Sequence, residues 1–342
     1  TNVMLHAPEI ARAAGYREFY KDIMSAEEFN HLSENVIPVI VNARPFGKYS
    51  MVDIDDKGGI QVFVKDLLKA GLLKGDVMTC TGMTLNEQVE SLSPNIPDGD
   101  VIYSVQNPFK HTGGLRLLGG NLSPEFSAVL KLAGVEGGLE NNLFTGSARV
   151  FNGEEALLKF LDTTPDQLQN NDMIVVRYEG PVGGPGMPEM LDSTSRITAI
   201  CRQNNIVVGL MTDGRFSGGS VGLVIGHVGP EAAIGGAIAL IENGDEIEVN
   251  LNLNQINCKE LENKETLQSR LNKWKREVDP ITNVHPSAGQ ADTRLLNRMR
   301  KSAVSAAHGA GMHPNNELFV CDPRQVEFSN FKPKNKFKNL TA

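Results

Sequence analysis

The sequence predicts an α/β fold with two domains. Its 342 residues are enough for two domains with a sizeable core. Up to about residue 90, helical patterns alternate with short apolar runs, which is typical of an α/β domain. Beyond about residue 106, short strands separated by glycines dominate, which indicates a barrel or a sandwich with helices at its ends.

The first part is expected to contain two helices and two strands. Residues 1–20 mix apolar and charged side chains as a helix does, and a second helix is expected over about 59–73. Apolar runs at 36–41 and 76–81 predict strands. Pro38 places the first of these strands at a sheet edge or at a bulge.

Turn-forming residues between positions 91 and 106 mark the boundary to the second part. Five short strands are expected there, at residues 115–118, 128–132, 173–178, 206–211 and 223–228. An Asn-Gly turn at 242–245, followed by alternating apolar residues, predicts a hairpin. Three helices are expected, at residues 156–161, 188–202 and 267–278. Pro188 suits a first helical position, and the apolar stripe of the last helix indicates core packing.

Charge and hydropathy argue against two classes of partner. The formal net charge of −8 argues against nucleic acid. The most apolar segment, residues 221–241, contains His227, Pro230 and Glu231 and is not apolar enough to cross a membrane. We therefore expect neither nucleic acid nor a membrane as a partner.

The four cysteines do not form a recognisable motif. No two of them make a C-x-x-C pair, and they stand far apart, as Cys80, Cys201, Cys258 and Cys321. So few cysteines in a chain of this length suit a reducing compartment. Buried free thiols are the expected state of all four.

The most informative motif is TDGRFSGG at residues 212–219, directly after the strand expected at 206–211. Glycines leave backbone N–H groups accessible in such a turn, which suits a carboxylate ligand. Ser217 can act on a bound acid if its pKa is lowered, and the planar fork of Arg215 can pair with a carboxylate. The alternative is an ordinary turn. Arg215 stands where a nucleophile elbow needs glycine, which disfavours a hydrolase.

A second unusual stretch, YEGPVGGPGMPEM at residues 178–190, joins a predicted strand to the helix expected from Pro188. Its glycines match neither a dinucleotide motif nor a P-loop. Glu189 has two interpretations. It is either a carboxylate in the first turn of a helix, stabilised by the helix dipole, or an oxygen ligand of Mg²⁺. Glu179, at the strand end, is a weaker candidate ligand.

His227 and Glu231 flank a third turn, which is also rich in glycine and proline. A lone histidine at such a place is more often a hydrogen-bonded structural group than a base. The sequence therefore assigns no catalytic role to His227.

Three ordered motifs together resemble the dihydroxy-acid dehydratases of branched-chain amino-acid synthesis. They lie at residues 177–191, 212–219 and 226–233, with shorter matches at 1–6, 47–49 and 121–124. The resemblance runs from Thr1 to about Leu251. It implies the remainder of an N-terminal α/β domain, residues 1–95, followed by a β-barrel-like (swivelling β/α) catalytic domain, residues 106–280. Residues 281–342 find no counterpart and are expected to form a C-terminal extension.

The resemblance implies a hydro-lyase that dehydrates 2,3-dihydroxy carboxylic acids to 2-keto acids. Ser217 matches the proposed base that removes the C2 proton, and Glu189 matches a Mg²⁺ ligand. Arg215 and Gly218 are expected to bind the substrate. Two alternatives stay open, namely a sugar-acid (aldonate) dehydratase of the same family and a non-catalytic half that requires a partner chain.

The resemblance also implies groups whose ligands this sequence does not contain. The family carries an iron–sulfur cluster on three cysteines, and we expect the [2Fe–2S] rather than the [4Fe–4S] type. These cysteines and the other Mg²⁺ ligands lie in a part that precedes the residues matching Thr1. The chain is therefore expected to be the C-terminal portion of the enzyme. A homodimer or higher homo-oligomer is implied, in the cytoplasm or, in a eukaryote, in the mitochondrion or plastid.

Overall fold

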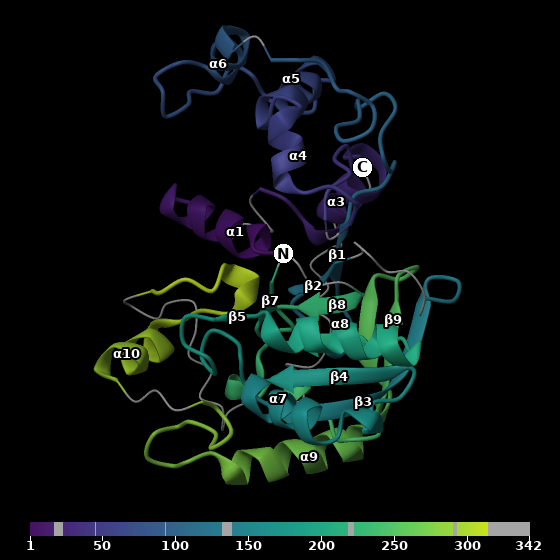
Figure 1. The fold of residues 1–342 in the computed structure, drawn as a ribbon. Coiled ribbons are helices and arrows are strands. Elements are labelled where there is room, and N and C mark those ends of the chain that lie inside the picture. Colours follow the sequence, from purple (N-terminus) through teal and green to yellow (C-terminus); the bar gives the residue numbers. More distant parts are fainter. Residues whose placement is uncertain are drawn as a thin grey trace, which may run out of the picture. The chain divides into compact units, whose positions relative to one another are not determined.

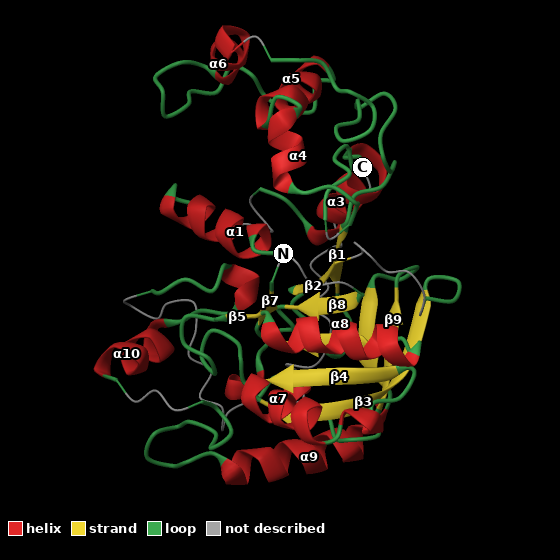
Figure 2. Ribbon diagram, in the orientation of Figure 1, coloured by secondary structure: helices red, strands yellow, loops and turns green. Residues whose placement is uncertain are grey.

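Two compact units make up the part of the chain that the computed structural model describes, which is residues 1–16, 23–44, 46–92, 94–131, 139–217, 222–289 and 293–313. The first, called the helical unit, is Glu27–Gly114. The second, called the barrel unit, joins Thr1–Ala26 to Leu115–Ala342. Figures 1 and 2 show helices in both units and an extended sheet in the barrel unit, so the predicted α/β class is confirmed.

Helices provide most of the regular structure of the helical unit. They are α3 (Ala26–His31), the π-helix η1 (Leu32–Val36), α4 (Met51–Asp56), α5 (Ile60–Lys69) and α6 (Leu85–Leu92). A capping box starts α4, because the Ser50 hydroxyl accepts from the N–H of Asp53 while the Asp53 carboxylate accepts from the N–H of Ser50. Ile54, Val62 and Ile102 form the centre of a small apolar core.

Two segments of the helical unit that the sequence predicts as strands form only isolated bridges. Residues 36–41 bridge to another segment at Val39 and at Val41, but not between them. Pro38 has no N–H to donate, which hinders a continuous ladder. Residues 76–81 form turns and a single bridge. The prediction of two strands here was wrong.

An eight-stranded sheet organises the barrel unit, in the order β1-β2-β8-β6-β4-β3-β9-β10. These strands are β1 (Leu115–Leu118), β2 (Ala128–Lys131), β3 (Leu143–Asn152), β4 (Asp172–Arg177), β6 (Gly209–Thr212), β8 (Leu223–Gly226), β9 (Glu246–Asn250) and β10 (Gln255–Cys258). The sheet nearly closes on itself beyond β1. There the N–H of Gly119 donates to the carbonyl of Asn254, and the N–H of Ile256 donates to the carbonyl of Gly119, both at 2.9 Å. The predicted barrel-like architecture is confirmed.

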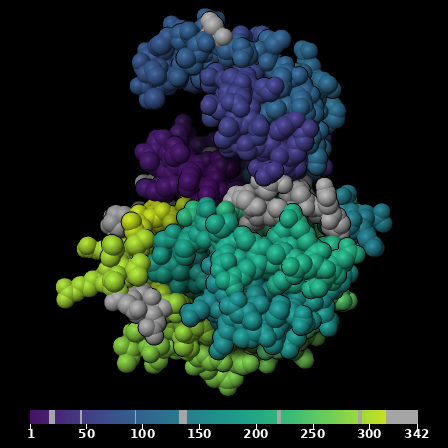
Figure 3. Space-filling model, viewed as in Figure 1, coloured from purple at the N-terminus to yellow at the C-terminus, as the bar shows by residue number. Residues whose placement is uncertain are grey.

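Side chains on the central strands alternate between two cores. On β4, Met173 faces the first core and its neighbour Ile174 faces the second. The first core includes side chains of α9 (Lys264–Glu277), and the second includes side chains of α7 (Glu154–Thr163) and α8 (Asp192–Asn204). In Figure 3 the teal and green residues of the barrel unit form a continuous surface on the face shown. A strand buried on both faces gives a fixed origin to the loop that follows it.

The helix expected over residues 188–202 is present as α8, but it starts later, because a short strand follows Pro188. Residues Glu189–Met190 form β5, which pairs in parallel with β7 (Arg215–Phe216), and α8 begins only at Asp192. Met190 and Phe216 are 1% and 4% exposed, so this pairing buries two apolar side chains. A contact between distant segments therefore overrides the local helix signal of proline.

The hairpin expected around the Asn-Gly turn also has a different place. The turn at 242–245 leads into β9, and Asn243 Oδ1 accepts from the N–H of Val150 at 2.7 Å. β9 and β10 do form an antiparallel hairpin, but it closes at residues 251–254. The alternation after the turn was therefore read correctly, whereas its partner strand was not.

Other helical segments of the barrel unit are α1 (Val3–Ala13), α10 (Arg294–Ser302) and the 3₁₀ turns η2 (Pro165–Gln167), η3 (Ala232–Ile234), η4 (Ala237–Leu240), η5 (Glu260–Glu262) and η6 (Ala306–His308). Met187 packs between Leu5 of α1 and Ala306 of η6, which anchors the chain just before β5. No helix in the described ranges combines the length and the apolar character that a bilayer span requires.

The described cysteines are free thiols in three different environments. Cys80 is exposed, Cys201 is half-buried and Cys258 is buried. Burial raises the pKa of the Cys258 thiol, which keeps it protonated. The expectation of buried thiols thus holds for Cys258 but not for Cys80, and Cys321 lies outside the described residues.

Candidate active site

The three sequence motifs follow strands whose C-terminal ends meet at one edge of the sheet. β8, β6 and β4 are neighbours and run parallel to one another. Residues 178–188 follow β4, residues 213–214 follow β6, and residues 227–231 follow β8. Loops at the carboxyl ends of parallel strands commonly form ligand sites. The fold thus gathers the three motifs at the edge of the sheet where such sites form.

Asp213 ties these motifs together through their backbones. Its carboxylate accepts from the N–H groups of Tyr178 and Glu179, each at a distance of 3.0 Å. It also accepts from the N–H of Ala232 at 2.8 Å. The side chain is fully buried; burial raises the pKa of Asp213, and the three N–H donors act in the opposite direction. Asp213 therefore fixes the start of the glycine-rich loop.

Glu231, from the third motif, holds the middle of the same loop. Its two carboxylate oxygens accept from the N–H groups of Val182 and Gly183, each at a distance of 2.8 Å. Burial, and then the nearby Asp213, raise the pKa of Glu231 to about 8. Both carboxylates are structural groups of the site, because their oxygens are occupied by backbone donors.

Glu189 and Arg215 lie side by side at the end of this loop. They are paired residues of β5 and β7. Arg215 Nε donates to the carbonyl of Met187 at 2.5 Å. Asn2 connects the two charged groups, since its Nδ2 donates to Glu189 Oε1 at 2.5 Å and its Oδ1 accepts from Arg215 Nη1 at 3.5 Å. The structure thus brings together two of the residues that the sequence selected.

Ser217 follows β7 directly and is half-buried. Residues two apart in an extended chain point to the same side, so Ser217 is expected on the side of Arg215, and hence of Glu189. Gly218 lies outside the described residues. The position of Glu189 on an exposed strand end removes one of its two interpretations, because it is not in the first turn of a helix.

The residues present fit a divalent cation only in part. Glu189 offers an exposed carboxylate, which is the hard oxygen donor that Mg²⁺ prefers. Within the described ranges, a single group of three potential ligands lies close enough to share an ion, namely Asp245, Cys258 and Glu260. Arg270 donates to both carboxylate oxygens of Asp245, so an arginine already neutralises that group. Glu189 is therefore not joined by two further close ligand residues in the described part of the chain, and it offers one protein carboxylate to a Mg²⁺ ion.

A cluster held by three cysteines finds no matching set in the described part of the chain. The group of three potential ligands found there includes one cysteine, Cys258. The described residues therefore do not fit an iron–sulfur cluster.

His227 is a buried residue of the site that the sequence did not select. It is 1% exposed, and neither of its ring nitrogens has a hydrogen-bond partner among the residues described. Burial, aided by the charge of Arg215, lowers the pKa of His227 to about 3, so the ring is neutral. The hydrogen bond expected for His227 is thus not found among the described residues, whereas its burial agrees with a structural group.

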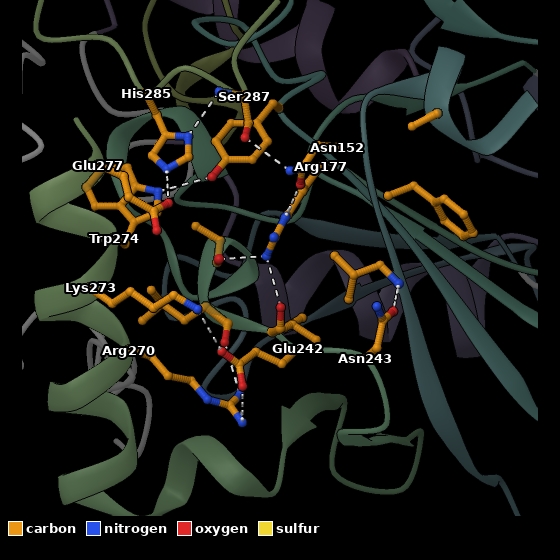
Figure 4. Close-up of a pocket in the computed structure, with 17 residues that line it drawn as sticks. Asn152, Arg177, Glu242, Asn243, Arg270, Lys273, Trp274, Glu277, His285 and Ser287 are labelled. Atoms are coloured by element: carbon orange, nitrogen blue, oxygen red, sulfur yellow. Dashed lines mark hydrogen bonds and ion pairs between the residues drawn. The ribbon is translucent and has the colours of Figure 1, made fainter. Parts of the chain in front are cut away.

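A cavity of about 520 Å³ opens elsewhere on the barrel unit, and Figure 4 shows its lining. It lies against the ends of β3 and β4, where His285 stacks between Tyr178 and Trp274 with ring centroids 5.0 and 5.5 Å apart. Arg177, which points into it, donates to the backbone carbonyls of Ile238, Ala239 and Ile241 and to Asn152 Oδ1. The guanidinium of Arg177 is thus already hydrogen-bonded to other groups of the lining.

The described lining of this cavity contains none of the residues that the sequence selected, namely Glu189, Arg215 and Ser217. We therefore place the candidate active site at the β5–β7 pair rather than in the cavity.

The chain belongs to the dihydroxy-acid/6-phosphogluconate dehydratase family. Residues 100–310 match the model of the family's C-terminal domain, and residues 1–88 match that of its N-terminal domain. The first match includes α10 and η6, which lie in the region that the sequence suggested as an extension.

Curated relatives named "Dihydroxy-acid dehydratase" are similar over most of this chain. The protein of a Nocardioides species is 40% identical over 310 residues, which is 91% of this chain and 50% of that protein. The protein of Acidothermus cellulolyticus is 43% identical over 73% of this chain and 41% of its own length. That of Acaryochloris marina is 43% identical over 81% and 46%, respectively. The chain therefore spans about half the length of the curated relatives it matches.

Sequence reasoning missed Asn2 and Asp213 as parts of the site, and it also missed Arg300 of α10, which donates to the carbonyl of Val182 in the loop after β4. Asp213 stood inside a selected motif, and its place between a strand and Gly214 was a usable signal for a buried, backbone-binding carboxylate. Asn2 and Arg300 offered no local signal, because their partners lie 187 and 118 positions away in the sequence.

Proposed function

We propose that the protein to which this chain belongs removes water from 2,3-dihydroxy carboxylic acids and forms 2-keto acids, as a step of branched-chain amino-acid synthesis. Membership of the dehydratase family and the names of the relatives support this proposal. The observation that carries it within the chain is the pairing of Glu189 with Arg215 on β5 and β7, two residues before Ser217.

The proposed chemistry is a β-elimination. The carboxylate of the acid pairs with the Arg215 guanidinium, which orients the substrate and disperses its charge. The Ser217 oxygen takes the proton from C2. The C2 electron pair forms the C2–C3 double bond as the C3–O bond breaks. The departing hydroxide takes up the proton that Ser217 removed, so water forms and the serine oxygen is restored. The resulting enol then becomes the 2-keto acid by moving its hydroxyl proton to C3.

Serine is a weak base, so its environment must favour the deprotonated oxygen. A bound Mg²⁺ supplies that effect as a Lewis acid and also stabilises negative charge that develops on the substrate. In this proposal Glu189 is one of its ligands. The [2Fe–2S] cluster that the family resemblance implies has no fitting residues in the described chain, and no step is assigned to it.

A substrate panel on the full-length protein, purified anaerobically with its native metal content, tests the proposal. We expect 2-keto acid from branched 2,3-dihydroxy acids in the presence of Mg²⁺. Turnover of aldonic acids alone would instead identify a sugar-acid dehydratase of the same family. No turnover of either class, with a full complement of metal, would favour a non-catalytic half that binds another chain. Size-exclusion chromatography of the same sample tests the proposed homodimer or higher oligomer.

A further inference from the structure

Two buried polar side chains, the carboxyl group of Glu231 and the guanidinium of Arg300, hold the loop that carries Glu189. Glu231 accepts from the N–H groups of Val182 and Gly183, as described above. Arg300 of α10 donates from Nε to the carbonyl of Val182 at 2.8 Å and from Nη2 to the carbonyl of Gly183 at 3.1 Å. Both residues of the loop are therefore bound at their N–H and at their C=O. We call Glu231 and Arg300 the loop clamp.

The burial of the loop clamp distinguishes it from ordinary surface charges. Glu231 is 4% exposed and Arg300 is 8% exposed. Burying a polar or charged group costs free energy unless its hydrogen bonds are satisfied, and among the described residues the clamp bonds to backbone groups. Arg300 also donates to the carbonyl of Gly289, so its fork serves three carbonyls. Arg298, on the same helix, is exposed and shows what an arginine of α10 does without such a role.

Two glycines of the loop allow close approaches, one to Glu231 of the clamp and one to the backbone of Tyr178. A Cβ on Gly180 would lie 2.6 Å from Glu231 Oε2, which is closer than real Cβ contacts. A Cβ on Gly183 would lie 2.5 Å from the carbonyl oxygen of Tyr178. Glycine at these positions therefore permits close approach of a carboxylate and of a neighbouring turn, rather than flexibility.

Hydrogen bonds continue from the clamp to the metal-ligand candidate. The N–H of Gly184 donates to the carbonyl of Gly180, and the N–H of Met187 donates to the carbonyl of Gly184, each at 2.7 Å. The carbonyl of Met187 accepts from Arg215, the residue paired with Glu189. A continuous path of hydrogen-bonded turns thus links residues 182–183 to the β5–β7 pair.

We propose that Arg300 and Glu231 are positioning residues for Glu189. They fix the two central peptides of the loop, and thereby present the Glu189 carboxylate to a divalent cation in a single orientation. The identity of the cation as Mg²⁺ rests on the proposed function. The hydrogen bonds of the loop clamp to residues 182 and 183 do not depend on which reaction the protein catalyses.

The test compares Arg300→Met with Arg298→Met in the full-length protein. Hydrogen exchange of the loop amides and Mg²⁺ affinity by titration calorimetry are the two readouts. We expect the Val182 and Gly183 amides to exchange at least about ten-fold faster in R300M, and Mg²⁺ to bind about 10- to 100-fold more weakly. Arg300→Lys is expected to rescue little, because an ammonium lacks the planar fork. R298M should match the wild type in both readouts.

Two results would overturn the proposal. One is a folded R300M whose loop amides keep wild-type protection. The other is faster exchange with unchanged Mg²⁺ affinity, since the clamp would then not position the ligand. If R300M does not fold, Glu231→Gln replaces it; it keeps one acceptor oxygen and is expected to shift both readouts in the same direction. A protein that behaves as expected here but dehydrates no dihydroxy acid contradicts the proposed function and leaves the clamp intact.

Discussion

Glu189 and Arg215 occupy paired positions on two parallel strands, and Asn2 is hydrogen-bonded to both. The backbones of the two residues therefore lie about one strand spacing apart, roughly 4.8 Å. Such a pair can hold a cation at one side and an acid at the other. Ser217, the proposed proton acceptor, comes two residues after Arg215 and is expected on the same side of the chain.

Replacing Arg215 by lysine tests its pairing with the substrate carboxylate. Lysine keeps the charge but loses the bidentate fork and the bond to the Met187 carbonyl. We expect KM for the dihydroxy acid to rise about 10- to 100-fold, which corresponds to about 1.4–3 kcal/mol. Steady-state kinetics of the full-length protein measure this effect. Arg202→Lys, at an exposed position of α8, is the matched control, and an R215K variant with the KM of the control would reject the pairing.

Replacing Glu189 by glutamine tests its role as a metal ligand. The amide keeps the shape and the bond from Asn2 but is a much poorer ligand for Mg²⁺. The Mg²⁺ concentration for half-maximal activity is expected to rise at least about ten-fold. Glu155→Gln removes an exposed carboxylate of α7 and should leave the titration unchanged. Identical Mg²⁺ curves for E189Q and E155Q would return Glu189 to a structural role.

Glu231 makes stability depend on pH in a predictable direction. Burial raises its pKa from 4.5 to about 8, so the folded chain holds a proton that the unfolded chain releases between these values. Its contribution to stability is therefore fully present below about pH 4.5 and is lost as the pH rises towards 8. Urea unfolding of wild type and Glu231→Gln at pH 5 and pH 8 measures this; about one proton of linkage at most is expected to disappear in E231Q. An equal difference between the two proteins at both pH values is incompatible with the raised pKa.

The first core depends on the apolar stripe of α9. Leu271 is 1% exposed and packs in that core. Leu271→Ala is expected to lower the free energy of unfolding by about 2–5 kcal/mol, through lost burial and the cavity left behind. Gln268→Ala, on the exposed side of the same helix, should change it by less than about 0.5 kcal/mol. A small effect of L271A in chemical denaturation would mean that α9 does not close the barrel unit.

Local pattern was enough for the strands and helices whose burial is local. The strand expected at residues 115–118 is β1, and the strand expected at 173–178 is β4 displaced by one residue. Met173 and its neighbours alternate between two cores, so the apolar run itself encodes the strand. The stripe at 267–278 likewise gave α9, because its period of burial is that of a helix.

Prediction failed where distant segments decide the structure. Pro188 is a good helix opener, but the pairing of Met190 with Phe216 draws the next residues into a strand. Arg300 lies in a region for which sequence reasoning found no family counterpart, whereas the family match runs to residue 310. Its role depends on carbonyls of the glycine-rich loop, and no local pattern reports such partners.

The removal of the C2 proton by Ser217 is the central claim, and Ser217→Ala in the full-length protein tests it most directly. Turnover of a branched 2,3-dihydroxy acid carrying deuterium at C2 reports both the product and the fate of that position. We predict a folded variant with Mg²⁺ affinity of the wild type, a kcat about 10²- to 10⁴-fold lower, and retention of deuterium in the unreacted acid. Loss of the C2 deuterium at the wild-type rate in S217A would contradict the account.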